Sequence, residues 1–247
     1  MSLYRITKYN PKYRDENGYY TLDEWIYFGQ IGTIINGNKF TFQEYLNTED
    51  KYVESIKIIL NELEISELRI LNFNTKNPFL NKSENLLGIE NFNAKDLIED
   101  QILNLQLVEK VIRSNLREFI ECELFNKKIR ISFGWDYYMY IRTDFALSSS
   151  IKKIEDIKLF IEKRPEEKKE LKRRIILGNK GSQYLLEEEI EISHVPVEKL
   201  KLLFGFSSEH PFDGYYELTD NIIDNLKNLI NYNFLPNKFY YIIETYE

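Results

Sequence analysis

Cysteine and histidine are scarce in this chain of 247 residues, which contains only Cys122, His194 and His210. A single cysteine excludes an intramolecular disulfide, argues against a thiolate metal site and indicates a reducing compartment. A Ser-His-Asp or Cys-His arrangement could assemble in space, but the chain lacks the Gly-x-Ser-x-Gly motif of many hydrolases. We therefore expect a core role for Cys122, structural roles for both histidines, and no metal or other cofactor.

Long apolar runs are also missing. None approaches the roughly 20 residues that a membrane-spanning helix needs, and the longest, such as 239–243, has the length of a strand. The first five residues lack the basic and apolar regions of a secretory signal. These absences predict a cytoplasmic protein that does not interact with membranes.

Phosphate-binding motifs are missing as well. The stretch 175–182 joins an apolar run to a Gly-rich turn, but Lys180 precedes Gly181, whereas a P-loop ends in Gly-Lys-Ser or Gly-Lys-Thr. We interpret it as a turn between strands. The basic run 163–174 is interrupted by glutamates, which predicts a solvated helix over 165–174 rather than a polyanion site.

Aromatic and acidic residues are abundant. The chain has 18 tyrosines and 16 phenylalanines, and its formal net charge is −7. Aromatic side chains bury large areas, so the chain can form a sizeable core without disulfides. A generally acidic protein approaches nucleic acid against a repulsive field, whereas a basic protein is attracted. We therefore expect a basic protein partner and no nucleic acid, although such a charge also serves solubility.

Hydrophobic periodicity and capping signals predict an α+β fold with mixed, largely antiparallel sheets packed against several helices. Thr41 and Glu44 form a capping box at the start of a helix. Further helices are expected at 94–118 (in two pieces around Asn104), 165–174, 197–204 and 220–231. Strands are expected at 3–9, 68–73, 119–124, 129–141, 157–161, 184–193 and 239–245, with a turn at 126–128.

The domain organisation is predicted from one linker signal. Ser148, Ser149 and Ser150 form the best linker candidate, which divides the chain into an α+β region over 1–147 and a second over 148–247. Three residues do not prove a boundary, so the second region is either a separate domain or part of the first.

The N-terminal residues carry a family resemblance. The relevant residues are Arg5 to Asp15, Gly18-Tyr19-Tyr20, Asp23-Glu24-Trp25 and Ile31-Gly32, followed later by Gly134 to Ile141. Over residues 1–141 this pattern resembles bacterial immunity proteins of polymorphic and contact-dependent growth inhibition toxin systems. In the family pattern small polar residues follow the tryptophan, whereas this chain has Ile26-Tyr27-Phe28. The resemblance implies a protein without catalytic activity that binds and neutralises a cognate toxin.

Acidic and aromatic residues are the candidates for binding such a partner. Nuclease toxins are basic, and carboxylates would steer and face them while tyrosine or tryptophan anchors exclude water. On a strand, Asp136, Tyr138 and Tyr140 would share one face, opposite Trp135 and Tyr137. The predicted partner-binding residues are Asp23, Glu24, Trp25, Asp136, Tyr138, Tyr140, Glu187 and Glu189.

Two other functions stay open at this point. The numerous carboxylates could support a metal-assisted hydrolase, which would require three or more of them to converge in one pocket. The chain could also be a self-associating scaffold. The sequence does not specify the toxin, its activity or the oligomeric state.

Overall fold

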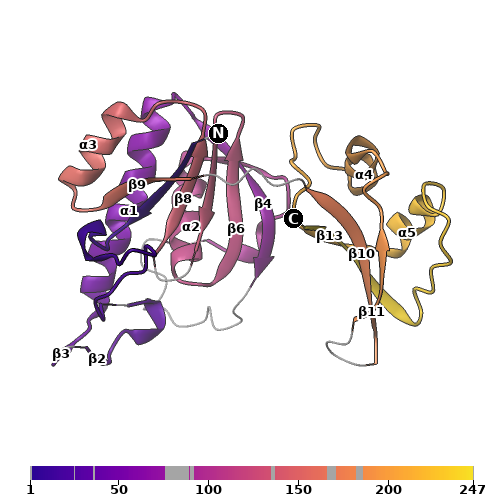
Figure 1. The fold of residues 1–247 in the computed structure, drawn as a ribbon, viewed down its shortest axis with the longest axis horizontal. Coiled ribbons are helices and arrows are strands. Elements are labelled where there is room, and N and C mark those ends of the chain that lie inside the picture. Colours follow the sequence, from indigo (N-terminus) through magenta and orange to yellow (C-terminus); the bar gives the residue numbers. More distant parts are fainter. Residues whose placement is uncertain are drawn as a thin grey trace. The chain divides into compact units, whose positions relative to one another are not determined.

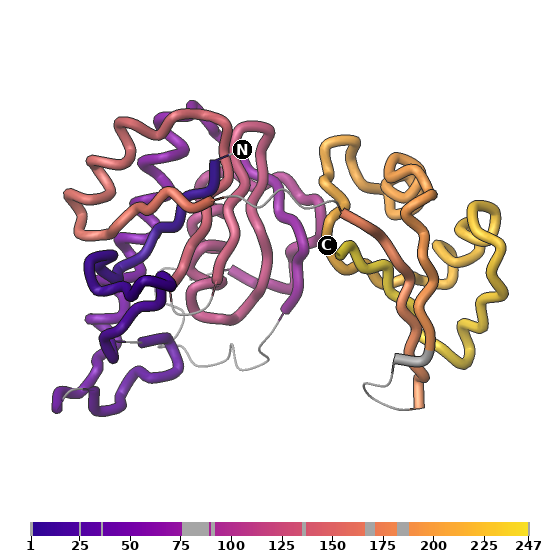
Figure 2. Tube along the Cα trace, viewed as in Figure 1, coloured from indigo at the N-terminus to yellow at the C-terminus, as the bar shows by residue number. Residues whose placement is uncertain are grey.

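The computed structural model describes residues 2–24, 26–35, 37–75, 89, 92–134, 137–165, 171–181 and 186–246, with the backbone alone at 186 and 187. The chain forms two compact units, Met1–Glu166 and Glu167–Glu247, here called unit 1 and unit 2 (Figure 1). The sequence colours in Figure 2 run through one unit before entering the other, so the chain passes between them once. The α+β fold class predicted from the sequence is confirmed.

Unit 1 is built on a seven-stranded sheet in which all neighbouring strands are antiparallel. In sheet order its strands are β5 (Ile102–Asn104), β4 (Glu67–Thr75), β6 (Ile120–Asn126), β7 (Ile129–Phe133), β8 (Met139–Thr143), β1 (Ser2–Thr7) and β9 (Phe160–Arg164). Three helices, α1 (Phe42–Glu62), α2 (Leu105–Leu116) and α3 (Ser148–Asp156), share one apolar core with alternate strand residues. The helices therefore cover one face of the sheet, which we call the inner face, and the opposite face is the outer face.

Helix α1 begins as the sequence predicts. The Thr41 hydroxyl accepts a hydrogen bond from the Glu44 backbone N–H at 3.2 Å, and the Glu44 carboxylate accepts one from the Thr41 N–H at 2.7 Å. The two bonds satisfy donors that the first helical turn leaves without partners. Tyr45, Ile56 and Ile59 then lie on the buried face.

Two expected elements of unit 1 are wrong in detail. The stretch 94–118 is not a helix in two pieces, because residues Ala94–Asp96 form a 3-10 turn, β5 follows and only α2 is helical. Asn104 is the N-cap of α2, with its side chain accepting from the Leu107 N–H at 3.0 Å. The expected strand 129–141 is split into β7 and β8 by a turn in which Tyr137 has φ +61°.

The proposed boundary at 147/148 falls inside unit 1. Ser148 to Ser150 are not a linker but the first residues of α3, and the Glu62 carboxylate accepts from the Ser150 N–H at 2.7 Å. Strand β9 then returns to the sheet and pairs with β1. The expected strand at 157–161 thus lies a few residues too early, because the α3 helix continues to Asp156.

Unit 2 contains a four-stranded antiparallel sheet with the order β11 (Leu186–Glu191), β10 (Lys172–Asn179), β13 (Phe239–Tyr246) and β12 (Tyr215–Glu217). Helices α4 (Val197–Phe204) and α5 (Asp220–Leu226) contribute Leu200 and Leu226 to a core shared with Ile175 and Ile243. The predicted bounds of α4 are confirmed, whereas α5 ends five residues earlier than predicted. Each unit has its own core.

The helix predicted at 165–174 is wrong where it can be checked. Residues 166–170 lie outside the described residues, and Lys172 to Arg174 begin the strand β10. Arg174 bonds across the sheet to Glu244 and Glu189. Tertiary pairing overrides the charge pattern that suggested a helix.

Short elements complete unit 1. They are the 3-10 helices η1 (Pro11–Tyr13), η2 (Phe28–Gln30) and η4 (Ala94–Asp96) and the hairpin of β2 (Ile34–Ile35) with β3 (Asn38–Lys39). Among the helices in the described ranges, none is both long and apolar enough to cross a membrane.

Candidate functional site

The segment between β1 and α1 exposes a group of large side chains. It contains little regular structure beyond η1, η2 and the β2–β3 hairpin. Tyr13, Tyr19, Tyr27 and Ile34 are 39%, 72%, 43% and 68% exposed. Single exposed apolar residues are normal, but several in one segment indicate a contact surface. We call residues 9–35 the N-terminal segment.

A buried arginine fixes this segment to the sheet. The Arg14 side chain is only 8% exposed, and its Nε donates to Glu162 of β9 at 3.0 Å. Its Nη1 donates to the Tyr138 hydroxyl at 3.1 Å and to the Gly18 carbonyl at 3.3 Å. Burial opposes the charge of Arg14, but the bonds to Tyr138 and Glu162 raise its pKa. Arg14 therefore stays charged and connects three parts of unit 1.

Arg5 completes this cluster on the outer face. Its guanidinium donates to the same Glu162 carboxylate, with the Nε bond at 2.9 Å. The Arg5 and Arg14 guanidinium carbons lie 4.9 and 5.6 Å from the centre of the Tyr138 ring. One carboxylate and one aromatic ring thus hold two guanidinium groups, in contacts that lower the cost of burying them.

A chain of aromatic rings continues from Tyr138. Its ring centre lies 5.7 Å from that of Tyr9 and 6.5 Å from that of Tyr140, and Tyr9 lies 4.9 Å from Tyr20. The Tyr20 hydroxyl donates to the Glu24 carboxylate at 2.9 Å. Burial and this bond raise the pKa of Tyr20 to about 12, so it remains a donor. The contacts connect Glu24 to Tyr140 across the N-terminal segment and β8.

The structure thus brings together three residues of the predicted site. Glu24, Tyr138 and Tyr140 belong to one cluster, and the exposed Asp23 adjoins Glu24 in the chain. Tyr138 and Tyr140 are half-buried. Trp25 and Asp136 lie outside the described residues, so their places in this cluster are not assigned.

The other two predicted residues belong to unit 2. Glu189 is exposed on β11, and its carboxylate pairs with Arg174 at 2.6 Å. Glu187 lies on the same strand, but its side chain is outside the described residues. Both residues therefore belong to an acidic strand of unit 2.

Sequence reasoning missed Arg5, Arg14 and Glu162 as a unit. Arg5 and Arg14 stand in the N-terminal stretch, but nothing local connects them to a carboxylate about 150 residues later. The alternation of Arg5 with Ile6 on β1 predicts only that the Arg5 side chain lies on the face opposite the core. The antiparallel register of β1 with β9 decides the pairing.

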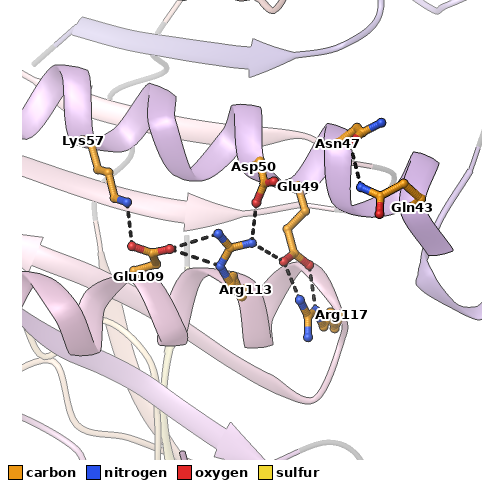
Figure 3. A network of polar contacts seen from close by, with 8 residues as sticks. All are labelled: Gln43, Asn47, Glu49, Asp50, Lys57, Glu109, Arg113 and Arg117. Carbon is orange, nitrogen blue, oxygen red and sulfur yellow. Dashed lines mark hydrogen bonds and ion pairs between the residues drawn. The ribbon is translucent and has the colours of Figure 1, made fainter. Parts of the chain in front are cut away.

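A second polar network lies on the inner side of unit 1, between α1 and α2 (Figure 3). The Glu49 carboxylate is fully buried and accepts from Arg117 at 2.6 and 2.7 Å and from Arg113 at 2.7 Å. Arg113 also pairs with Asp50 and Glu109, and Lys57 pairs with Glu109 at 2.6 Å. Three carboxylates thus face three cations.

The contacts of this network are those of ion pairs within and between helices. Its charges balance, and the bonds from Lys57 and Arg113 lower the pKa of Glu109 although burial opposes this. A general acid or base needs a pKa near the working pH, which this carboxylate does not have. The geometry fixes α1 on α2.

An apolar groove of about 270 Å³ lies beside this network, also between α1 and α2. Val53, Ile56 and Val108 are among its apolar lining residues, and Lys57 and Glu109 stand at its border. It offers volume for a small apolar group, and its lining also includes Asn61, Glu64 and Ser66.

Cys122 and His210 are buried, whereas His194 is exposed. Burial raises the pKa of the Cys122 thiol to about 12, which makes it unreactive. His210 is buried against the Phe206 ring at 4.1 Å, and its Nδ1 accepts from the Phe212 N–H. In the described ranges no three His, Cys, Asp or Glu side chains converge to hold a metal ion. The convergent carboxylates that a metal-assisted hydrolase requires are thus not found there.

Comparison with known proteins gives one match. A family model described as "Domain of unknown function (DUF7683)" matches residues 173–244, well under half of the chain. The matched stretch lies within unit 2 and extends from β10 to β13. No curated protein and no solved structure matches the chain significantly. The description of this family gives no activity.

Proposed function

We propose that this protein is a cytoplasmic immunity protein that binds a cognate bacterial toxin and neutralises it by occluding the active site, without catalysis. The observation that carries this proposal is the N-terminal segment, which exposes three tyrosines and is held to the sheet by Arg14 and Glu162. Tyrosine supplies a large contact area at low conformational cost, and a fixed segment loses little entropy on binding. This segment is therefore the best-supported contact surface.

The charge of this surface favours a basic partner. Asp15, Glu16, Asp23 and Glu24 are all exposed in the N-terminal segment, whereas Arg14 is buried and paired. Exposed carboxylates around aromatic anchors speed the capture of a cation-rich surface and exclude like-charged partners. Toxins that cleave nucleic acid bind polyanions and have such basic surfaces, so a nuclease is the proposed target.

Co-expression with the toxin-like domain encoded beside the gene tests this proposal. We expect growth rescue together with a stoichiometric complex on co-purification. Tyr19→Ala should weaken the complex by at least about tenfold, as for an interface anchor. Tyr215→Ala is the matched control, because Tyr215 is 67% exposed in unit 2 and Tyr19 is 72% exposed.

Four outcomes would contradict the proposal. Rescue without a complex would indicate enzymatic detoxification. If neither rescue nor a complex were observed, the basis for an immunity function would be lost. A complex lost with Tyr215→Ala but kept with Tyr19→Ala would place the interface in unit 2. A stable homo-oligomer that does not bind the toxin would favour the scaffold alternative.

A further inference from the structure

The outer face of the unit 1 sheet carries arginine on four of its seven strands, in one line across the sheet. The strand register aligns these residues directly. From β4 to β9 the line is Arg69, Phe125, Arg130, Arg142, Leu3 and Arg164, each paired with the next. We call this line the arginine row. Four guanidinium groups are thus interleaved with two apolar side chains.

Strand alternation places the row on the side away from the helices. Met139, Ile141 and Thr143 of β8 are buried, so Arg142 between them points to the other face. Arg130 alternates in the same way with Ile129 and Ile131, which belong to the core. The helices therefore do not cover the row.

The charge of the row is only partly balanced. Arg69 pairs with Asp100, and Arg130 pairs with Glu123. Arg142 and Arg164 make no ion pair or hydrogen bond through their side chains within the described residues. Two of the four arginines of the row are therefore without a balancing carboxylate in the described residues, although the chain's net charge is −7.

The register also imposes an unfavourable contact. Arg130 and Arg142 stand directly opposite each other on β7 and β8. Like charges in this position destabilise a sheet. Arg130 is already paired with Glu123, so a bound anion would chiefly balance Arg142.

We propose that the arginine row binds the phosphate backbone of single-stranded nucleic acid. The guanidinium fork matches phosphate oxygens in a bidentate way. Half-buried Phe125 and Tyr140 lie on the same face and offer π-surfaces for bases. From β4 to β9 the row extends over about 24 Å, at the usual spacing of about 4.8 Å between strands. That length accommodates several nucleotides.

Nucleic acid fits this face better than an acidic peptide does. An extended peptide gains affinity mainly from backbone hydrogen bonds at a free strand edge. Arg130 and Arg142 lie on β7 and β8, whose backbones are paired on both sides. A single strand needs only phosphate contacts and stacking. The expectation of no nucleic acid rested on the overall charge, which does not describe this face.

The test uses the full-length protein and a labelled single-stranded RNA. An RNA of about 16 nucleotides is long enough, because this is the upper site size of one single-strand-binding domain. Fluorescence anisotropy should show binding at low salt. In a salt titration, the logarithm of the association constant should fall linearly with the logarithm of the salt concentration, with a slope of about −0.7 for each phosphate contact. The double variant Arg142→Glu with Arg164→Glu should weaken binding at least about tenfold and reduce this slope. No toxin is needed, so the outcome is independent of the proposed immunity function.

The matched control reverses two exposed lysines on helices, Lys152→Glu with Lys199→Glu, for the same change in net charge. It should weaken binding far less. An equal loss in both double variants would overturn the proposal, because net charge alone would then explain it. Absence of RNA binding at low salt would also overturn the proposal. So would competition by poly-L-glutamate as strong as that by unlabelled RNA, because the arginine row would then recognise carboxylates.

Arg142→Gln separates binding from a structural role. It removes the repulsion with Arg130, so the thermal unfolding midpoint should stay the same or rise while RNA affinity falls severalfold. A lower midpoint with unchanged RNA affinity would mean that Arg142 supports the fold, and it would overturn the proposal.

Discussion

Units 1 and 2 both place helices on one face of an antiparallel sheet, but their ion pairs differ in burial. In unit 1 the Glu49 and Arg117 side chains are both 0% exposed. In unit 2 the Arg174 and Glu189 side chains are 27% and 41% exposed. In unit 1 the charged pair is enclosed between α1 and α2, whereas in unit 2 it joins two strands of the sheet.

The difference teaches that similar bond lengths have different energetic meanings. The Arg117–Glu49 and Arg174–Glu189 contacts both measure 2.6 Å. A buried pair has lost its hydration, so removal of one partner leaves an uncompensated charge. An exposed pair regains water when it breaks. Burial rather than distance should therefore decide the effect of mutation.

The largest effect is expected for Glu49→Gln. This change leaves buried Arg117 without its carboxylate and should lower the free energy of unfolding of unit 1 by about 3–5 kcal/mol. Urea titration followed by tryptophan fluorescence measures it, because Trp25 and Trp135 are the only tryptophans and both belong to unit 1. Glu54→Gln, at an exposed position of α1, is the control. A loss below about 1 kcal/mol would mean that water reaches the pair.

A pH-dependent effect of intermediate size is expected from Lys8. Burial lowers its pKa to about 8, although Glu24 opposes the shift. Between about pH 8 and about pH 10.5 the unfolded chain therefore binds more protons than the folded one. Burial of charged Lys8 lowers the free energy of unfolding by its full amount below about pH 8, and this loss disappears as pH rises towards about 10.5. Lys8→Met should stabilise unit 1 relative to wild type by on the order of 1–3 kcal/mol near neutral pH.

Urea titrations of both proteins between neutral pH and about pH 10 would measure this difference, which should shrink as pH rises. Lys51→Met provides a control, because it makes the same change at another half-buried lysine, on α1. A difference between Lys8→Met and wild type that is constant with pH would contradict the assignment.

The smallest effect is expected for Glu189→Gln in unit 2. Arg174 keeps its 2.6 Å contact with Glu244 when Glu189 is neutralised, and the site remains hydrated. The loss of stability should lie between 0 and about 1 kcal/mol. Far-ultraviolet circular dichroism of the full chain reports both units and tryptophan fluorescence reports unit 1 alone, so only the former signal should change. If Glu189→Gln lowered the free energy of unfolding as much as Glu49→Gln does, burial would not explain the difference between the two ion pairs.

Elements with strong local signals were predictable from the sequence. The Thr41–Glu44 capping box and the helix after Pro196 depend on bonds within a few residues, so the sequence contains all the partners. Strand β10 was missed because its first residues, Lys172 to Arg174, have the charge pattern of a surface helix. Their partners on β13 and β11 are distant in the chain, and these partners decide the conformation.

The candidate site was predictable only in part. Asp23, Glu24, Tyr138 and Tyr140 stood out because acidic and aromatic residues were clustered in the sequence. Their grouping depends on Arg14 and Glu162, which are 148 positions apart. The arginine row could not be found either, since its members are regularly placed only across strands.

The sequence by itself determined the α+β class, several helix boundaries, the core role of Cys122 and an average negative charge. Each of these follows from composition or from contacts between near neighbours, which any chain of this sequence would share. Only the tertiary structure decided the boundary between the units, the burial of Glu49 and the line of arginines across an acidic protein. These depend on strand register and helix packing, which bring together residues that the sequence keeps far apart.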